Sequence, residues 1–244
     1  MTGGQQAQPQ ASGIADTGRI ESSDIANAIR GDRERLRQLI AEIEQSDRAS
    51  VAALLAGLIR NPDRDVRGWL PWAAPRFLGA EAVPLLVPLA DDRDADVRTE
   101  AMDALVELDL AYLVEFVPRY VDLAKGDDSS LAMYGILRLT RYRVPEAVAL
   151  FDDLALNAGH PSTRNHARIM ALVLKGQEDE ILAGLQGENH ELMPIWIKAA
   201  LYLGSGRVLA AIEEVARSDA HDRCRGYASG GLTKFDELRP PGRD

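Results

Sequence analysis

The stretch Asp91-Asp-Arg-Asp-Ala-Asp-Val-Arg-Thr-Glu-Ala-Met-Asp-Ala-Leu105 decides the fold class of this chain. An acidic turn leads into Val97-Arg98, and small or apolar residues follow at Ala101, Ala104 and Leu105. Residues three and four positions apart lie on the same face of an α-helix. The stretch therefore predicts a turn followed by an amphipathic helix.

The same pattern recurs along the chain, with a Val-Arg-like pair near the start of each unit. The aligned residues are Val66, Val97, Leu131, Thr163, Met193 and Cys224, so neighbouring units are 30 to 34 residues apart. An apolar stretch precedes each unit, and a turn rich in Asp, Gly or Pro separates the two. This period predicts a stack of helical hairpins, each of which buries its apolar face against its neighbours.

The sequence divides into four parts. Residues 1–21 are rich in Gln, Gly, Ala and Ser and predict a disordered leader. Residues 22–47 predict two N-terminal capping helices, separated near Gly31-Asp32. Residues 48–235 form the repeat array, and residues 236–244 form a short polar tail. Pro71 and Pro75 predict that the helix containing Val66 kinks or ends early.

The composition argues against several classes of protein. The net charge of −10 disfavours binding to nucleic acid, whose phosphates must be neutralised by Lys and Arg. One cysteine cannot form an internal disulfide, and the N-terminus lacks the pattern of a signal peptide. No apolar run approaches the length of about 18 residues that a membrane span requires. These features predict a cytoplasmic protein that binds neither nucleic acid nor membrane.

The segment Asp94–Leu105 resembles the HEAT repeat, specifically the short type found in phycobilisome lyases. Asp63–Arg67 and Pro161–Ala167 resemble it in part. The resemblance implies an all-α fold, a right-handed α-solenoid of about six HEAT-like hairpins. It also implies a structural ladder in which the Val-Arg arginines pair with turn aspartates of neighbouring units. The arginines are Arg67, Arg98, Arg164 and Arg225, and the available aspartates are Asp65, Asp96, Asp128 and Asp222. The alternative, a row of arginines that binds phosphate or carboxylate ligands, stays open.

No motif in the sequence predicts a catalytic residue, a cofactor or a metal ion. Only one His-Glu pair, His190-Glu191, is present, whereas the di-iron site of the HEAT-like deoxyhypusine hydroxylases uses several. Two enzymatic alternatives remain from the resemblance. Trp69, Trp72, Asp63 and Asp65 lie close together, as a DNA-glycosylase-like HEAT enzyme would require, and a bilin-lyase-like maturation factor shares the repeat type.

A strip of apolar residues indicates a binding surface. Positions two, six and nine residues after the aligned residue lie on the side of each second helix opposite its buried face, where polar residues are expected. Several units carry apolar residues there, namely Trp72, Met133, Leu137, Ile169, Leu172, Ile195 and Tyr202. In HEAT-like arrays this side is concave. The strip therefore predicts a non-catalytic scaffold or adaptor that holds a protein or peptide partner, while burial of the strip in a homo-oligomer stays open.

Overall fold

The computed structural model describes residues 20, 22–187, 189–217 and 222–233. The polar tail and all but one residue of the predicted leader lie outside these residues. Within them the regular elements are helices and no strand is present, which confirms the all-α class. The chain divides into two compact units, residues 1–112 and 113–244, and the boundary falls inside the predicted repeat array.

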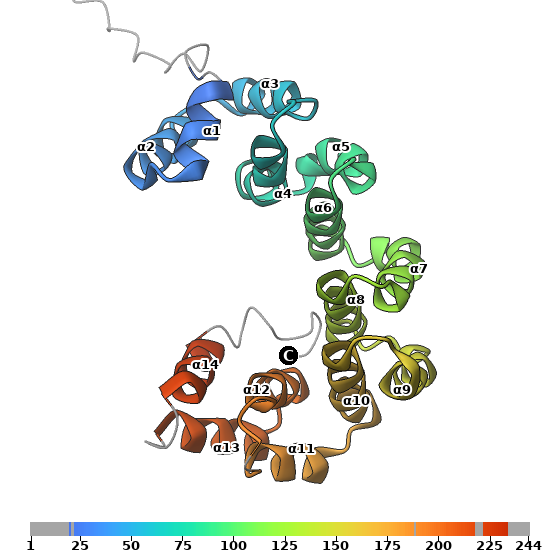
Figure 1. The fold of residues 1–244 in the computed structure, drawn as a ribbon. Coiled ribbons are helices and arrows are strands. Elements are labelled where there is room, and N and C mark those ends of the chain that lie inside the picture. Colours follow the sequence, from blue (N-terminus) through green and yellow to red (C-terminus); the bar gives the residue numbers. More distant parts are fainter. Residues whose placement is uncertain (1–19, 21, 188, 218–221, 234–244) are drawn as a thin grey trace, which may run out of the picture. The chain divides into compact units, whose positions relative to one another are not determined.

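Unit 1 begins with the two predicted capping helices, α1 (Ser22–Arg30) and α2 (Arg33–Glu44). Helix α3 (Arg48–Leu58) then forms a hairpin with α4 (Arg64–Leu78), and α4 packs against both α1 and α6 (Ala95–Leu108) (Figure 1). The elements between α4 and α6 are short, namely η2 (Gly79–Ala82), α5 (Val83–Leu86) and η3 (Val87–Asp91). Helix α4 therefore lies at the centre of this unit.

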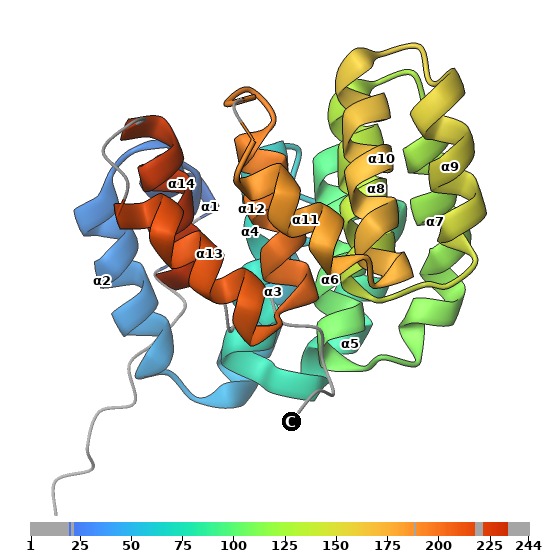
Figure 2. The same cartoon turned by 90° about the horizontal axis from the view of Figure 1, so that it is seen from below.

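Unit 2 contains two rows of helices. One row consists of α8 (Ser129–Arg141), α10 (Pro161–Lys175), α12 (Met193–Leu203) and α14 (Asp222–Thr233), and neighbours in this row pack together. The other row consists of α7 (Tyr112–Lys125), α9 (Ala147–Asn157), α11 (Glu178–Leu185) and α13 (Gly206–Arg217). Figure 2 shows α9 beside α10, the most extensive hairpin contact in the unit. Along the chain the helices of the two rows alternate.

The acidic turns start the second helices. The residue three positions before the aligned residue is the N-cap of α4, α6, α8 and α10. Its side chain accepts a hydrogen bond from the backbone N–H two residues later, at 2.8 to 3.2 Å. The capping residues are Asp63, Asp94, Asp128 and His160. These side chains satisfy amide groups that the first helical turn leaves without partners, and they fix where each helix begins.

The Val-Arg arginines bind the turn that precedes their own helix. Arg67, Arg98 and Arg164 each donate from Nη1 to the carbonyl oxygen six residues earlier, at 2.8, 2.7 and 2.6 Å. The aspartate partners expected for these three arginines are therefore wrong. Asp65 and Asp96 pair with Arg64, which lies three residues before Arg67. Asp128 caps α8, while the side chain of Asp222 lies outside the described part.

One of these arginines does reach an aspartate of the next turn. Nε and Nη2 of Arg67 donate to the two carboxylate oxygens of Asp92, at 2.7 and 2.9 Å. Both side chains are buried, with 4% and 8% of their surface exposed. The hydrogen bond from Arg67 lowers the pKa of Asp92 below its ordinary value. The Arg67–Asp92 pair thus joins the turn before α4 to the turn before α6.

Two stretches that contain proline differ from what the sequence predicts. The apolar stretch before the unit of Val97, residues 81–90, does not form one helix but is broken into η2, α5 and η3, because Pro84 and Pro88 each remove a backbone donor. In contrast, α4 continues through Pro71 and Pro75 to Leu78, so the expectation that it ends early is wrong. Leu70, Ala73, Ala74 and Leu78 are buried along this helix, and their packing maintains it.

Most of the predicted apolar strip is buried or half-buried. Ile169 and Tyr202 are 0% and 2% exposed, and Ile195 is also buried. Met133, Leu137 and Leu172 are half-buried. The expectation that Ile169, Ile195 and Tyr202 form an open surface is therefore wrong. These side chains lie in the row α8–α10–α12, whose neighbouring helices pack against one another and cover the outward positions.

Arg143 links two helices of that row. It lies in the turn after α8 with φ of 55°, and it donates from Nη1 and Nη2 to the carbonyl oxygens of Val173 and Tyr202, at 3.1 and 2.6 Å. These oxygens belong to the last turns of α10 and α12, where a cation interacts favourably with the helix dipole. The backbone at Tyr202 is therefore part of the internal structure of unit 2.

A single helical run, Arg64–Asp91, is long and apolar enough to cross a membrane by length and composition among the described residues. Core helices pass the same test, so the finding is weak evidence. The run also changes direction at Gly79, where φ is 58° and the elements become short.

Candidate functional site

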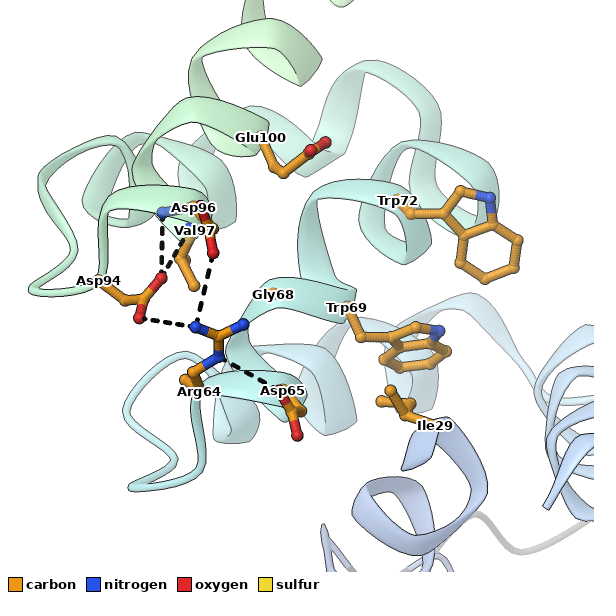
Figure 3. Close-up of a pocket in the computed structure, with 10 residues that line it drawn as sticks. All are labelled: Ile29, Arg64, Asp65, Gly68, Trp69, Trp72, Asp94, Asp96, Val97 and Glu100. Carbon is orange, nitrogen blue, oxygen red and sulfur yellow. Dashed lines mark hydrogen bonds and ion pairs between the residues drawn. The ribbon is translucent and has the colours of Figure 1, made fainter. Parts of the chain in front are cut away.

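A pocket of about 330 Å³ lies in unit 1 between α1, α4 and α6 (Figure 3). Its walls combine two indole rings and aliphatic side chains with several carboxylates. The lining residues are Ile29 from α1, Arg64, Asp65, Gly68, Trp69 and Trp72 from α4, Asp94 from the turn before α6, and Asp96, Val97 and Glu100 from α6. The pocket is therefore aromatic on one side and acidic on the other.

Trp72 gives the pocket an exposed aromatic wall. Its side chain is 48% exposed, whereas Trp69 is only 8% exposed. The two rings are 6.1 Å apart between centroids, because residues three apart share one helix face. Phe77 contacts Trp72 edge-on, and the guanidinium of Arg76 lies 5.4 Å from the centroid of the Trp72 ring. These contacts hold the Trp72 ring in place while leaving half of it accessible.

The acidic side contains one arginine among several carboxylates. Arg64 lies 3.3 Å from Asp65 and 3.5 Å from both Asp94 and Asp96, as the dashed lines in Figure 3 show. Its side chain is 60% exposed, and exposed pairs of this kind contribute little to stability. Glu100 extends from α6 toward Trp72 (Figure 3). The lining thus carries four carboxylates and one guanidinium, a balance of −3.

The packing of α4 against α6 brings these residues together. Asp94 caps α6, Asp96 lies in its first turn, and both face α4 because α4 and α6 pack side by side. Gly68 leaves the space between the helices open. A Cβ atom on Gly68 would lie 3.7 Å from the nearest Val97 methyl group, an ordinary contact. The pocket is therefore a gap that α1, α4 and α6 leave between them.

The position of Gly68 leads to a prediction about stability. Gly68→Ala should raise the free energy of unfolding by about 0.5–1 kcal/mol, because alanine restricts the unfolded chain and favours the helix. The added methyl group meets no atom closer than 3.7 Å. Chemical denaturation of the two proteins checks this result, and a loss of stability would show that the gap is closed.

Some of the predicted site residues line the pocket and others lie outside it. Trp72, with Trp69 and Asp65, lies in the pocket, and Asp96 lines its acidic side. Asp63 is not among the lining residues; it caps α4 and pairs with Arg30. The pocket also contains Arg64, Gly68, Asp94 and Glu100, which no pattern in the sequence marks as site residues. Asp94 belongs to an acidic turn, and such a turn by itself indicates only the start of a helix.

Unit 2 contains a second group of titratable residues. Burial lowers the pKa of His166 on α10, although the carbonyl of Ser162 acts in the opposite direction. Burial also lowers the pKa of Lys198 on α12, and the charge of Arg138 lowers it further. Among the described residues, no group of three or more His, Cys, Asp or Glu side chains could hold a metal ion.

Comparisons with protein-family models, with curated proteins and with solved structures found no match. A function for the chain must therefore be argued from its own geometry. The feature that demands an explanation is Trp72, a large apolar side chain held half-exposed at the wall of a pocket.

Proposed function

We propose that this chain is a non-catalytic interaction scaffold that holds a protein or peptide partner in the pocket at Trp72. The proposal includes a HEAT-like right-handed solenoid and a cytoplasmic location. Its partner surface differs from the strip expected from the sequence, because most of that strip is buried or half-buried. Trp72 is the most exposed member of the strip, with 48% of its surface accessible.

The repeated construction of the turns supports the HEAT-like assignment. An N-cap side chain starts α4, α6, α8 and α10, and an arginine from three of these helices binds the carbonyl six residues earlier. The same local solution in successive hairpins is what a tandem repeat requires. Such arrays commonly present extended binding surfaces.

The exposure of Trp72 carries the proposal of partner binding. Tryptophan is enriched among the residues that dominate protein interfaces, because its ring buries a large apolar area at a small entropic cost. The neighbouring contacts with Trp69, Phe77 and Arg76 hold the ring before a partner arrives. Binding of a partner then costs little conformational entropy at this side chain.

The enzymatic alternatives have less support from the pocket. A DNA-glycosylase-like reaction would use a carboxylate beside the tryptophans, but Asp63 accepts from the backbone N–H of Asp65 and from Arg30. Asp65 in turn pairs with both Arg30 and Arg64 at 3.3 Å. The balance of −3 in the lining would also repel the phosphates of nucleic acid.

Selection of peptides on the full chain tests the proposal. A random dodecapeptide library displayed on phage is enriched on the immobilised protein, and the enriched peptides are synthesised and measured in solution. Trp72→Ala should weaken their binding by about tenfold or more, as expected for an anchoring aromatic residue. Fluorescence anisotropy with labelled peptides gives the dissociation constants.

Tyr227→Ala is the matched control, because Tyr227 is an aromatic residue with 47% exposure against 48% for Trp72. This change on α14 should alter the dissociation constants by less than about twofold. Circular dichroism should show the same helical content for both variants. The proposal is wrong if no peptide is enriched, or if the enriched peptides bind the Trp72 variant as tightly as the unchanged protein.

A further inference from the structure

We infer that the segment held at Trp72 is positively charged, with an arginine or lysine side chain placed between the Trp72 ring and the carboxylates of α6. The inference rests on the proposed function, since it names the chemistry of the partner that the scaffold holds. It follows from the charge of the pocket, from the faces that its rings offer and from the balance of charge in the whole chain.

The charge of the lining favours a cationic occupant. Asp65, Asp94 and Asp96 all lie near Arg64, and all three distances are 3.3 Å or longer, while Asp65 also pairs with Arg30 at 3.3 Å. Glu100 adds a further carboxylate on the side toward Trp72. A cation from a partner would therefore enter a lining in which the carboxylates outnumber the guanidinium by four to one, and it would meet carboxylates that hold Arg64 only loosely.

The aromatic wall recognises cations directly. The face of an indole ring attracts a guanidinium or ammonium group, and the geometry at Trp72 already shows such a contact with Arg76. Arg76 also pairs with Glu44 at 2.7 Å, so its charge is directed partly away from the pocket. An arginine from a partner would stack against the accessible part of the ring and pair with Glu100 or Asp96.

A peptide fits this site better than an isolated cation. The indole N–H of Trp69, buried at the wall of the pocket, has no hydrogen-bond acceptor among the described residues. A peptide backbone offers carbonyl acceptors together with the cationic side chain. The net charge of −10 also steers basic segments toward the chain from a distance.

Three labelled peptides of equal length test the inference on the full chain. They share one glycine-rich backbone and carry arginine, glutamine or glutamate at the same alternate positions. Fluorescence anisotropy should show the arginine peptide binding about tenfold more tightly than the glutamine peptide at low salt, with a smaller difference at high salt. The glutamate peptide should bind most weakly.

A pair of double variants separates the pocket from the general charge of the chain. The double variant Asp96→Asn with Glu100→Gln should bind the arginine peptide about tenfold more weakly than the unchanged protein. Glu115→Gln with Asp122→Asn removes the same charge from exposed positions on α7 and should change binding by less than about twofold. The inference is overturned if the glutamine peptide binds as tightly as the arginine peptide, or if both double variants have equal effects.

The library selection distinguishes failure of this inference from failure of the proposed function. Enriched peptides that depend on Trp72 and are rich in arginine or lysine support both. Enriched peptides that depend on Trp72 but contain neutral or acidic residues leave the scaffold proposal standing and overturn the cationic partner. Enriched peptides that bind the Trp72 variant as tightly as the unchanged protein overturn both the scaffold proposal and the cationic partner.

Discussion

Replacing Arg67 by Ala is expected to lower the free energy of unfolding by about 3–5 kcal/mol, the cost of leaving a buried charge without its partner. Arg67 binds both carboxylate oxygens of Asp92, and only 4% and 8% of the two side chains is exposed. It also donates from Nη1 to the carbonyl of Asn61 at 2.8 Å. The substitution thus removes the connection between two successive turns.

Chemical denaturation of Arg67→Ala measures this loss, and Arg64→Ala serves as the control. Arg64 lies one helical turn earlier on α4, but its side chain is 60% exposed and its pairs are 3.3–3.5 Å long. Its removal should cost less than about 1 kcal/mol. Equal losses for the two variants would contradict the role assigned to the buried pair.

Lowering the pH should reduce the difference in the free energy of unfolding between the unchanged protein and Arg67→Ala. The hydrogen bond from Arg67 lowers the pKa of Asp92 from its ordinary value of 3.8. A carboxyl group with a lowered pKa contributes stability above that ordinary value and loses it as the pH falls through the lower native value. Denaturation at successively lower pH therefore provides a second measurement of the same pair.

Gly135→Ala is expected to lower the free energy of unfolding by about 1–3 kcal/mol through overpacking. A Cβ atom on this residue of α8 would lie 2.5 Å from the carbonyl oxygen of Tyr120 and 2.7 Å from the amide nitrogen of Ala124. Both atoms belong to the backbone of α7, so no side-chain rotation can relieve the clash. The two helices would have to separate.

The comparison with Gly68→Ala makes this prediction specific. Both glycines lie in helices, and helix propensity alone would make either substitution stabilising by about 1 kcal/mol. The structure predicts that the free energy of unfolding rises for Gly68→Ala and falls for Gly135→Ala, because Gly68 faces an open gap and Gly135 faces the backbone of α7. Chemical denaturation of both variants under the same conditions measures the two changes in the free energy of unfolding. A stabilised Gly135→Ala variant would contradict the close packing of α7 and α8.

Much of the secondary structure could be predicted from the periodicity of the sequence. The apolar stretch that precedes the unit of Leu131 forms α7, and the expected break near Gly31-Asp32 separates α1 from α2. Apolar spacing determines which residues of a helix can face a core, and Asp or Gly between such stretches marks the turns. The repeat alignment at Val97 likewise located the start of α6, because its acidic turn supplies the N-cap.

The buried strip could not be predicted in the same way. Helical periodicity assigns Ile169 and Tyr202 to the side opposite the hairpin contact, but it does not describe the adjacent helices of the same row. In unit 2 those neighbours pack along α8, α10 and α12 and bury both residues. The partner of Arg67 was missed for a related reason, since the path of the turn places Asp92, rather than Asp65 or Asp96, beside the guanidinium.

The pocket could be predicted only in part. Trp72 stood out as a large apolar residue at an outward position, and the structure leaves it 48% exposed. Its acidic surroundings come from the next repeat, through Asp94, Asp96 and Glu100. Their distance from Trp72 depends on how α4 packs against α6, which the repeat period alone does not determine.

The most direct test of partner binding follows the indole N–H signals of the three tryptophans by nuclear magnetic resonance. Trp69 and Trp72 line the pocket, whereas Trp196 lies on α12 in unit 2 and serves as an internal control. Titration with the arginine peptide should shift the Trp72 signal, with a smaller shift for Trp69 and none for Trp196. A titration that shifts Trp196 alone, or that leaves Trp72 unchanged while the peptide binds, would contradict a partner site in this pocket.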